Sequence, residues 1–110
     1  MATYDDFAKI DMRVGKIIAV EEFPRAMKPT YKVHVDFGDE IGTKWSSVQA
    51  KKNYTIDEMM GRYVIAVVNF PPKNIAGFMS EVLILGVPTA ENGLSLLAPT
   101  LPPELGGRVY

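Results

Sequence analysis

The chain has 110 residues and a net charge of −1, and hydrophobic residues make up 47% of it. This length suits one domain with one modest core, and the composition is that of an ordinary globular protein. The absence of cysteine excludes disulfides, thiolate metal sites and cysteine nucleophiles. No apolar run is long enough to span a bilayer and the first residues carry no secretory signal pattern, so we expect a cytoplasmic protein without stable membrane insertion.

The first half of the chain predicts a short helix and three strands. Thr3 and Asp6 have the spacing of a helix cap. Residues 12–21 predict a strand. We expect a bulge at Gly15, where the apolar residues change from even-numbered to odd-numbered positions. After a proline-containing loop, residues 31–37 alternate strictly between apolar and polar, which predicts a half-buried strand. A glycine-rich turn then leads into a third strand over residues 43–48.

The second half begins with a clear helix signal. Thr55 and Glu58 form a capping box, and Gly61 ends the helix after one or two turns. Residues 63–69 are a run rich in β-branched residues, as expected of a strand buried on both sides. Residues 82–85 and 94–98 predict further strands. This order predicts a mainly β fold, a five-stranded OB-fold barrel with a short helix between strands three and four, as a single domain over residues 1–110 with small terminal extensions.

No catalytic or metal chemistry is predicted. His34, the only histidine, shares a strand face with Asp36, but no serine nucleophile is placed beside it. We therefore expect a solvated histidine on an outward face. One histidine and no cysteine do not make a zinc site, and no glycine-rich phosphate motif is present. The sequence favours a non-enzyme without a metal or another cofactor.

Aromatic and methionine side chains near loops are the candidate binding residues. Flexible thioethers and aromatic rings form adaptable apolar pockets for varied peptide side chains. Phe78 and Met79 are equally suited to cover the open end of the barrel or a dimer seam, and for Phe70 a place in the core or the seam is favoured. The candidate peptide-binding residues are Trp45, Phe70, Phe78 and Met79.

A basic rim around that pocket is the second candidate feature. Residues 41–80 carry a local charge of +3, although each lysine alone also fits ordinary solvated surface. An aromatic residue beside a lysine on a barrel strand is also typical of single-stranded nucleic-acid binding. Peptide and nucleic acid thus compete for one predicted surface. The candidate rim consists of Lys16, Lys44, Lys51, Lys52, Lys73, Ser80 and Glu81.

The apolar, proline-rich segment 97–105 is the candidate dimer interface. It contains a single charge and would be a poor surface for a monomer. A twofold partner would bury it, and a tail wrapped around its own barrel is the alternative. The candidate interface residues are Leu97, Pro99, Leu101, Pro102 and Leu105.

Several motifs resemble a known family. Residues 7–17 (FAKIDMRVGKI), 69–73 (NFPPK) and 79–82 (MSEV) are similar to landmarks of EMAP-type tRNA-binding domains, which also occur at the C-terminus of methionyl-tRNA synthetases. Residues 23–26, 35–38, 44–47 and 67–86 resemble the free-standing CsaA-type chaperones of that family.

The resemblance implies two activities. It implies a cytosolic homodimer of barrels that acts as a chaperone for unfolded or export-destined polypeptides, and it also implies tRNA binding. In tRNA-binding relatives Ser-Glu is usually followed by Gly-Met, whereas here Val82 and Leu83 follow Ser80 and Glu81. This departure favours the chaperone branch.

Overall fold

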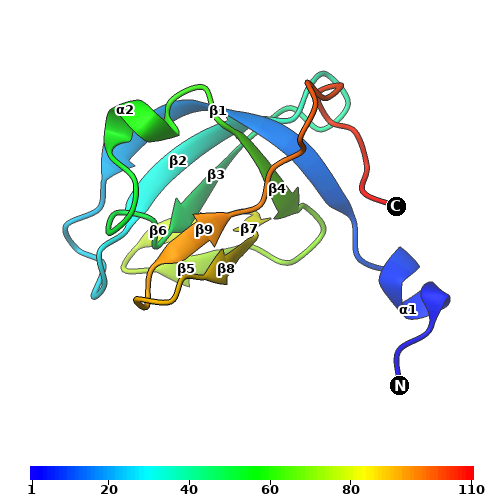
Figure 1. Ribbon diagram of the computed structural model, residues 1–110, viewed down its shortest axis with the longest axis horizontal. Helices are drawn as coiled ribbons and strands as arrows, with labels where there is room; N and C mark the ends of the chain where they lie inside the picture. The colour runs from blue at the N-terminus through cyan, green and yellow to red at the C-terminus, as the bar shows by residue number, and fades with distance from the viewer.

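The computed structural model describes residues 1–110 and contains a nearly closed barrel built on one five-stranded sheet (Figure 1). All pairings within the sheet are antiparallel. This architecture confirms the predicted barrel. In spatial order the strands are β3 (Thr43–Val48), β2 (Tyr31–Asp36), β1 (Met12–Glu22), β4 (Tyr63–Val67) and β7 (Leu83–Ile84).

The long strand β1 is shared by two ladders. Its first half pairs with β4 and its second half with β2, and the register slips between Ile17 and Ala19. The bulge therefore lies at Ile18, and its predicted place at Gly15 was wrong. Gly15 serves close packing instead, because a Cβ atom there would lie 2.4 Å from Val35 Cγ1 and 2.8 Å from the Phe37 ring.

The inward side chains of the strands fill the barrel. Tyr31, Val33, Val35 and Phe37 are buried, as the alternating pattern predicted. Burial of each large apolar side chain stabilises the fold by about 1.5–3 kcal/mol. Met59, fully buried, adds the contribution of helix α2 (Ile56–Met59) to the same core.

The predicted capping box of α2 is present. The Thr55 side chain accepts a hydrogen bond from the Glu58 N–H, and the Glu58 carboxylate accepts one from the Thr55 N–H. The pKa of Glu58 lies below its ordinary value because that backbone N–H stabilises the carboxylate. Gly61, with φ of +77°, takes the left-handed conformation after the helix.

Two short hairpins lie below the barrel in the view of Figure 1, and of their four strands only the last, within the predicted strand over residues 94–98, was expected from the sequence. One joins β5 (Lys73–Ile75) to β6 (Phe78–Ser80), and the other joins β8 (Gly86–Pro88) to β9 (Leu94–Leu96). The first turns through Ala76 and Gly77, with φ of 49° and 85°. Two consecutive positive φ angles are typical of a tight hairpin turn, but alanine at the first position obscures the sequence signal.

Both chain termini lie at one side of the barrel (Figure 1). Helix α1 (Tyr4–Ala8), capped by Thr3 and Asp6 as predicted, stands clear of the barrel and buries no residue. Residues 106–109 run along the first half of β1, where the Gly106 N–H donates to the Val14 carbonyl (2.9 Å) and the Val109 N–H to the Met12 carbonyl (2.9 Å). This part of the tail wraps around its own barrel.

Candidate ligand-binding surface

The outer face of strands β1, β2 and β3 carries the candidate site. Because side chains alternate along a strand, the outward residues of β2 are Lys32, His34 and Asp36. Trp45 lies directly across from His34 on β3, and their rings are stacked in parallel with centroids 4.4 Å apart. This face of strands two and three is the usual ligand surface of OB-fold barrels.

Four rings form a continuous cluster on this face, which we call the aromatic shelf: Phe23, His34, Trp45 and Phe78. The Phe78 ring meets Trp45 edge-on, at 6.3 Å between centroids and an interplanar angle of 89°. Phe23, from the loop after β1, lies 5.4 Å from Phe78 and is itself buried. Such edge-to-face pairs contribute about 0.5–1.5 kcal/mol beyond their buried area.

Lys32 supplies a positive charge to the shelf. Its Nζ atom lies 4.9 Å from the Phe23 ring centroid and 5.1 Å from that of Phe78, so the ammonium group contacts both rings. Arg25 lies nearby at the hairpin tip, since its guanidinium is 3.9 Å from the place that a Cβ of Gly77 would occupy. The shelf therefore combines apolar rings with cationic groups.

A shallow hollow of about 510 Å³ opens beside the shelf. Met79 is 48% exposed there and presents its flexible thioether. A volume of this size suits an apolar side chain or a short segment of a ligand. The lining residues are Glu21, Lys32, Trp45, Pro72, Phe78, Met79 and Glu81.

Glu81 and Ser80 hold this side of the barrel together. The Trp45 N–H donates to the Glu81 carboxylate (2.9 Å), and the Glu81 N–H donates to the Trp45 carbonyl (2.8 Å). Ser80 is buried, and its hydroxyl accepts a hydrogen bond from the Ser47 N–H (3.0 Å). Both residues, predicted for the binding rim, thus join β3 to the last residue of β6 and to the residue that follows it.

The structure separates the four predicted peptide-binding residues. Trp45, Phe78 and Met79 line the hollow beside the shelf, but Phe70 lines a second hollow of about 610 Å³. Lys73 and the half-exposed Leu83 also lie there. Phe70 is therefore not part of the shelf.

The predicted lysines do not gather around the shelf. The Lys44 side chain is on the same face of the sheet as that of Val35, across from it. Trp45 is on the opposite face, because neighbouring residues of a strand point to opposite faces. Lys51 pairs with Glu22 (2.5 Å), which raises the pKa of Lys51. Lys52 donates to the Glu91 carbonyl. Lys16 is on the outward face of β1 across from Asp36, and its side chain extends to Gly61. The cations that lie beside the rings of the shelf and the β5–β6 turn are Lys32 and Arg25.

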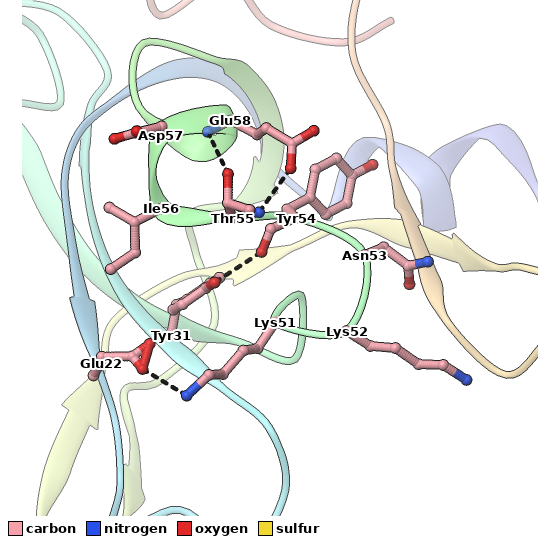
Figure 2. A pocket seen from close by; sticks show the side chains of 10 residues that line it. All are labelled: Glu22, Tyr31, Lys51, Lys52, Asn53, Tyr54, Thr55, Ile56, Asp57 and Glu58. Atoms are coloured by element: carbon pink, nitrogen blue, oxygen red, sulfur yellow. Dashed lines mark hydrogen bonds and ion pairs between the residues drawn. The ribbon is translucent and has the colours of Figure 1, made fainter.

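A third hollow, of about 500 Å³, lies at the end of the barrel beside α2 (Figure 2). Its polar groups are largely paired with one another: Lys51 with Glu22, the Tyr31 hydroxyl with the Tyr54 carbonyl (2.8 Å), and Thr55 with Glu58. Groups that already have partners leave fewer donors and acceptors for a ligand. The aromatic shelf is therefore the stronger candidate.

Sequence reasoning missed Phe23, Lys32 and the role of His34. His34 faces outward, as expected, but its stacking on Trp45 makes it part of the shelf. The alternation of residues 31–37 placed His34 correctly; only the register between β2 and β3 pairs it with Trp45.

The predicted dimer residues divide into two groups. Leu97 and Leu101 are 38% and 76% exposed, and Pro99 is exposed as well. Leu105 is partly covered, since its carbonyl lies 3.1 Å from the place of a Cβ on Gly38. Pro102 is exposed. The segment thus leaves an apolar surface without cover within the chain.

Neither helix of the chain has the length and hydrophobicity that crossing a bilayer requires.

Fold and surface together define a class of protein: an OB-type barrel whose outer β2–β3 face carries aromatic rings and a lysine. The family model described as a putative tRNA-binding domain matches residues 12–108, and the chain belongs to this family.

Similar proteins fall into two groups. Crystal structures of CsaA chaperones from Picrophilus torridus and Bacillus anthracis are 52% and 43% identical to the chain, with TM-scores of 0.94 and 0.92. Both cover 100% of this chain, which in turn covers 100% and 99% of theirs. The methionine–tRNA ligase of Pyrococcus abyssi is 42% identical over 106 residues, but the chain spans only 14% of its length.

Proposed function

We propose that the chain is a molecular chaperone that holds unfolded or export-destined polypeptides on the aromatic shelf, in the cytoplasm and by binding without catalysis. The observation that carries this proposal is the exposed Met79 beside the rings of Trp45 and Phe78. The likeness to CsaA chaperones along the whole chain supports it.

The chemistry of the shelf suits varied clients. Aromatic faces bury apolar side chains of different shapes, and the thioether of Met79 adapts to each. Lys32 offers its charge to carbonyl or carboxylate oxygens of the bound segment, since it forms no ion pair within the chain. Contacts of this kind are individually weak, so release needs no nucleotide.

We propose a homodimer as the working form. The exposed Leu97, Pro99 and Leu101 form an apolar surface that a second copy would cover. Two shelves on one dimer would bind one long unfolded chain with an avidity above that of either shelf alone.

tRNA binding is the second candidate function. The family description favours it, and so does the combination of stacked rings with Lys32 on the β2–β3 face. Bases stack on aromatic side chains while lysines attract phosphates. This function would use the same shelf.

The first test replaces two residues at the shelf and its hollow. The double variant F78S/M79S is expected to suppress aggregation of an unfolded polypeptide less well than the parent chain, while size-exclusion chromatography shows the same oligomeric state. L83S is the matched control, because Leu83 is 48% exposed like Met79 but lies in the second hollow. Unchanged holding by F78S/M79S, or an equal loss in L83S, would contradict the shelf as the site.

A salt titration distinguishes the two functions. Binding of a tRNA pool is expected to weaken steeply with salt, because lysine–phosphate contacts release counterions. Binding of an unfolded polypeptide to apolar rings is expected to change much less. Tight, salt-dependent tRNA binding with no polypeptide binding would favour the second function.

A further inference from the structure

Trp45 is the central ring of the shelf, and its orientation decides which surface a ligand meets. The indole is held from two sides, by the parallel His34 ring at 4.4 Å and by the edge-on Phe78 ring at 6.3 Å. His34 comes from β2, within the main sheet, whereas Phe78 comes from the separate β5–β6 hairpin. Only His34 is a direct neighbour of Trp45 in the same sheet.

The contact between His34 and Trp45 is built into the barrel. The two residues are cross-strand partners, with Lys32–Ser47 and Asp36–Thr43 as the neighbouring pairs. The antiparallel ladder fixes their Cα positions, and directly opposite side chains on one face contact each other. The interplanar angle of 0° shows that the two ring planes are parallel.

The imidazole of His34 has no polar partner within the chain. It is half-buried, and neither ring nitrogen forms a hydrogen bond within the chain. Histidine is the side chain that ordinarily changes charge between roughly pH 5 and pH 8. A proton gained there would add a second positive charge to a shelf that already contains Lys32.

We propose that His34 is the positioning residue of the shelf: its stack orients Trp45 for a bound polypeptide, and its protonation makes the shelf discriminate between basic and acidic client segments. This inference rests on the proposed function. Protonation keeps the stack, because a cation over an indole face is attracted to it. The added charge repels lysine and arginine side chains of a client and attracts glutamate and aspartate.

Other charges face His34 and act on the same client. None of them depends on the imidazole, so replacement of His34 alone isolates its effect. On β2 these charged residues are Lys32 and Asp36, and on β1 they are Lys16 and Glu21, which lie across from Asp36 and Lys32. After β6, the Glu81 carboxylate accepts a hydrogen bond from the Trp45 N–H.

The test uses two variants and two peptides. The probes share a central Leu-Phe segment, flanked by lysines in one and by glutamates in the other. His34→Phe keeps an aromatic stack without a titrating charge, and His34→Ala removes the stack. Affinity is measured from about pH 8 to about pH 5, with indole fluorescence as readout, since Trp45 is the only tryptophan.

At the upper pH, H34A, which has lost the stack, is expected to bind both peptides about fivefold more weakly than the parent chain. H34F keeps a ring on Trp45 and is expected to lose less affinity than H34A. As pH falls, the parent chain is expected to lose about threefold in affinity for the lysine peptide and to gain for the glutamate peptide. H34F is expected to show no such divergence.

Distinct results overturn the inference and the proposed function. H34A binding as tightly as the parent chain would refute the positioning role. Divergence with pH that persists in H34F would refute the charge role. If the parent chain binds neither peptide at any pH, the proposed function fails. Stronger binding of a single-stranded RNA oligomer at the same residues would assign the shelf to nucleic acid.

Discussion

The two faces of strand β2 differ in what they do. Inward, Tyr31, Val33 and Val35 are at most 4% exposed and lock into the core. Outward, His34 is half-buried and touches Trp45 across the strands, with solvent on the remaining side. Close packing on one face gives stability, and loose packing on the other leaves surface for a ligand. Stability and binding are therefore expected to respond to different substitutions.

The largest expected effect is on the inward face. Phe37→Ala should lower the free energy of unfolding by about 3–5 kcal/mol, because a fully buried ring leaves a cavity. Urea denaturation measures the change. The part of the population that stays folded should bind polypeptide normally, and a specific loss of affinity in folded F37A would break the separation between the faces.

The next effect concerns the outward face. Trp45→Ala removes the central ring of the shelf and should weaken polypeptide binding by about 2 kcal/mol, as a buried aromatic anchor does. The free energy of unfolding should change less, since Trp45 is only half-buried. Isothermal titration and urea denaturation on the same sample test the contrast. A large loss of stability without loss of binding would reverse it.

Glu81 is bonded to the backbone of Trp45. Glu81→Ala leaves the Trp45 N–H without its acceptor and should cost about 1–3 kcal/mol of stability together with part of the affinity. Glu81→Gln keeps an acceptor oxygen and should retain most of both. Thermal unfolding and peptide binding of the two variants are the measurements. Equal behaviour of E81A and E81Q would show that this hydrogen bond does not hold the shelf.

The smallest effect lies away from both faces, at the cap of α2. Thr55→Ala should cost about 1 kcal/mol. The pKa of Glu58 is lowered in the folded chain by the Thr55 N–H, so its contribution is present above the ordinary value of 4.5 and is lost as the pH falls through the lowered value. The stability of Glu58→Gln, measured by acid unfolding, should lack this pH-dependent contribution of Glu58. Polypeptide binding to the shelf should stay unchanged.

The barrel could be read from the sequence because its signals are local. The strict alternation of residues 31–37 and the capping box at Thr55 each lie within a few residues. The β5–β6 hairpin escaped prediction, because its strands are three residues long and Ala76 hides the turn. Gly15 was given the wrong role, since the Val35 side chain that it accommodates is twenty residues away along the chain.

The candidate site was predicted only in part for the same reason. Trp45, Phe78 and Met79 were singled out by residue type and proximity to loops. Their neighbours on the shelf come from distant segments, so neither the contact of Lys32 with Phe78 nor the buried position of Phe23 has a local signal. The lysines of the rim were predicted from the charge along the chain, which does not report the face of the sheet to which each lysine points.

By itself, the sequence determined which residues face inward, because hydrophobic periodicity reports burial one strand at a time. It also determined that the chain is a small barrel of this family. Only the tertiary structure decided that His34 stacks on Trp45, that Lys32 covers two rings, and that Glu81 closes the barrel. Strand register and loop placement bring these groups together, and both are set by packing across the whole barrel.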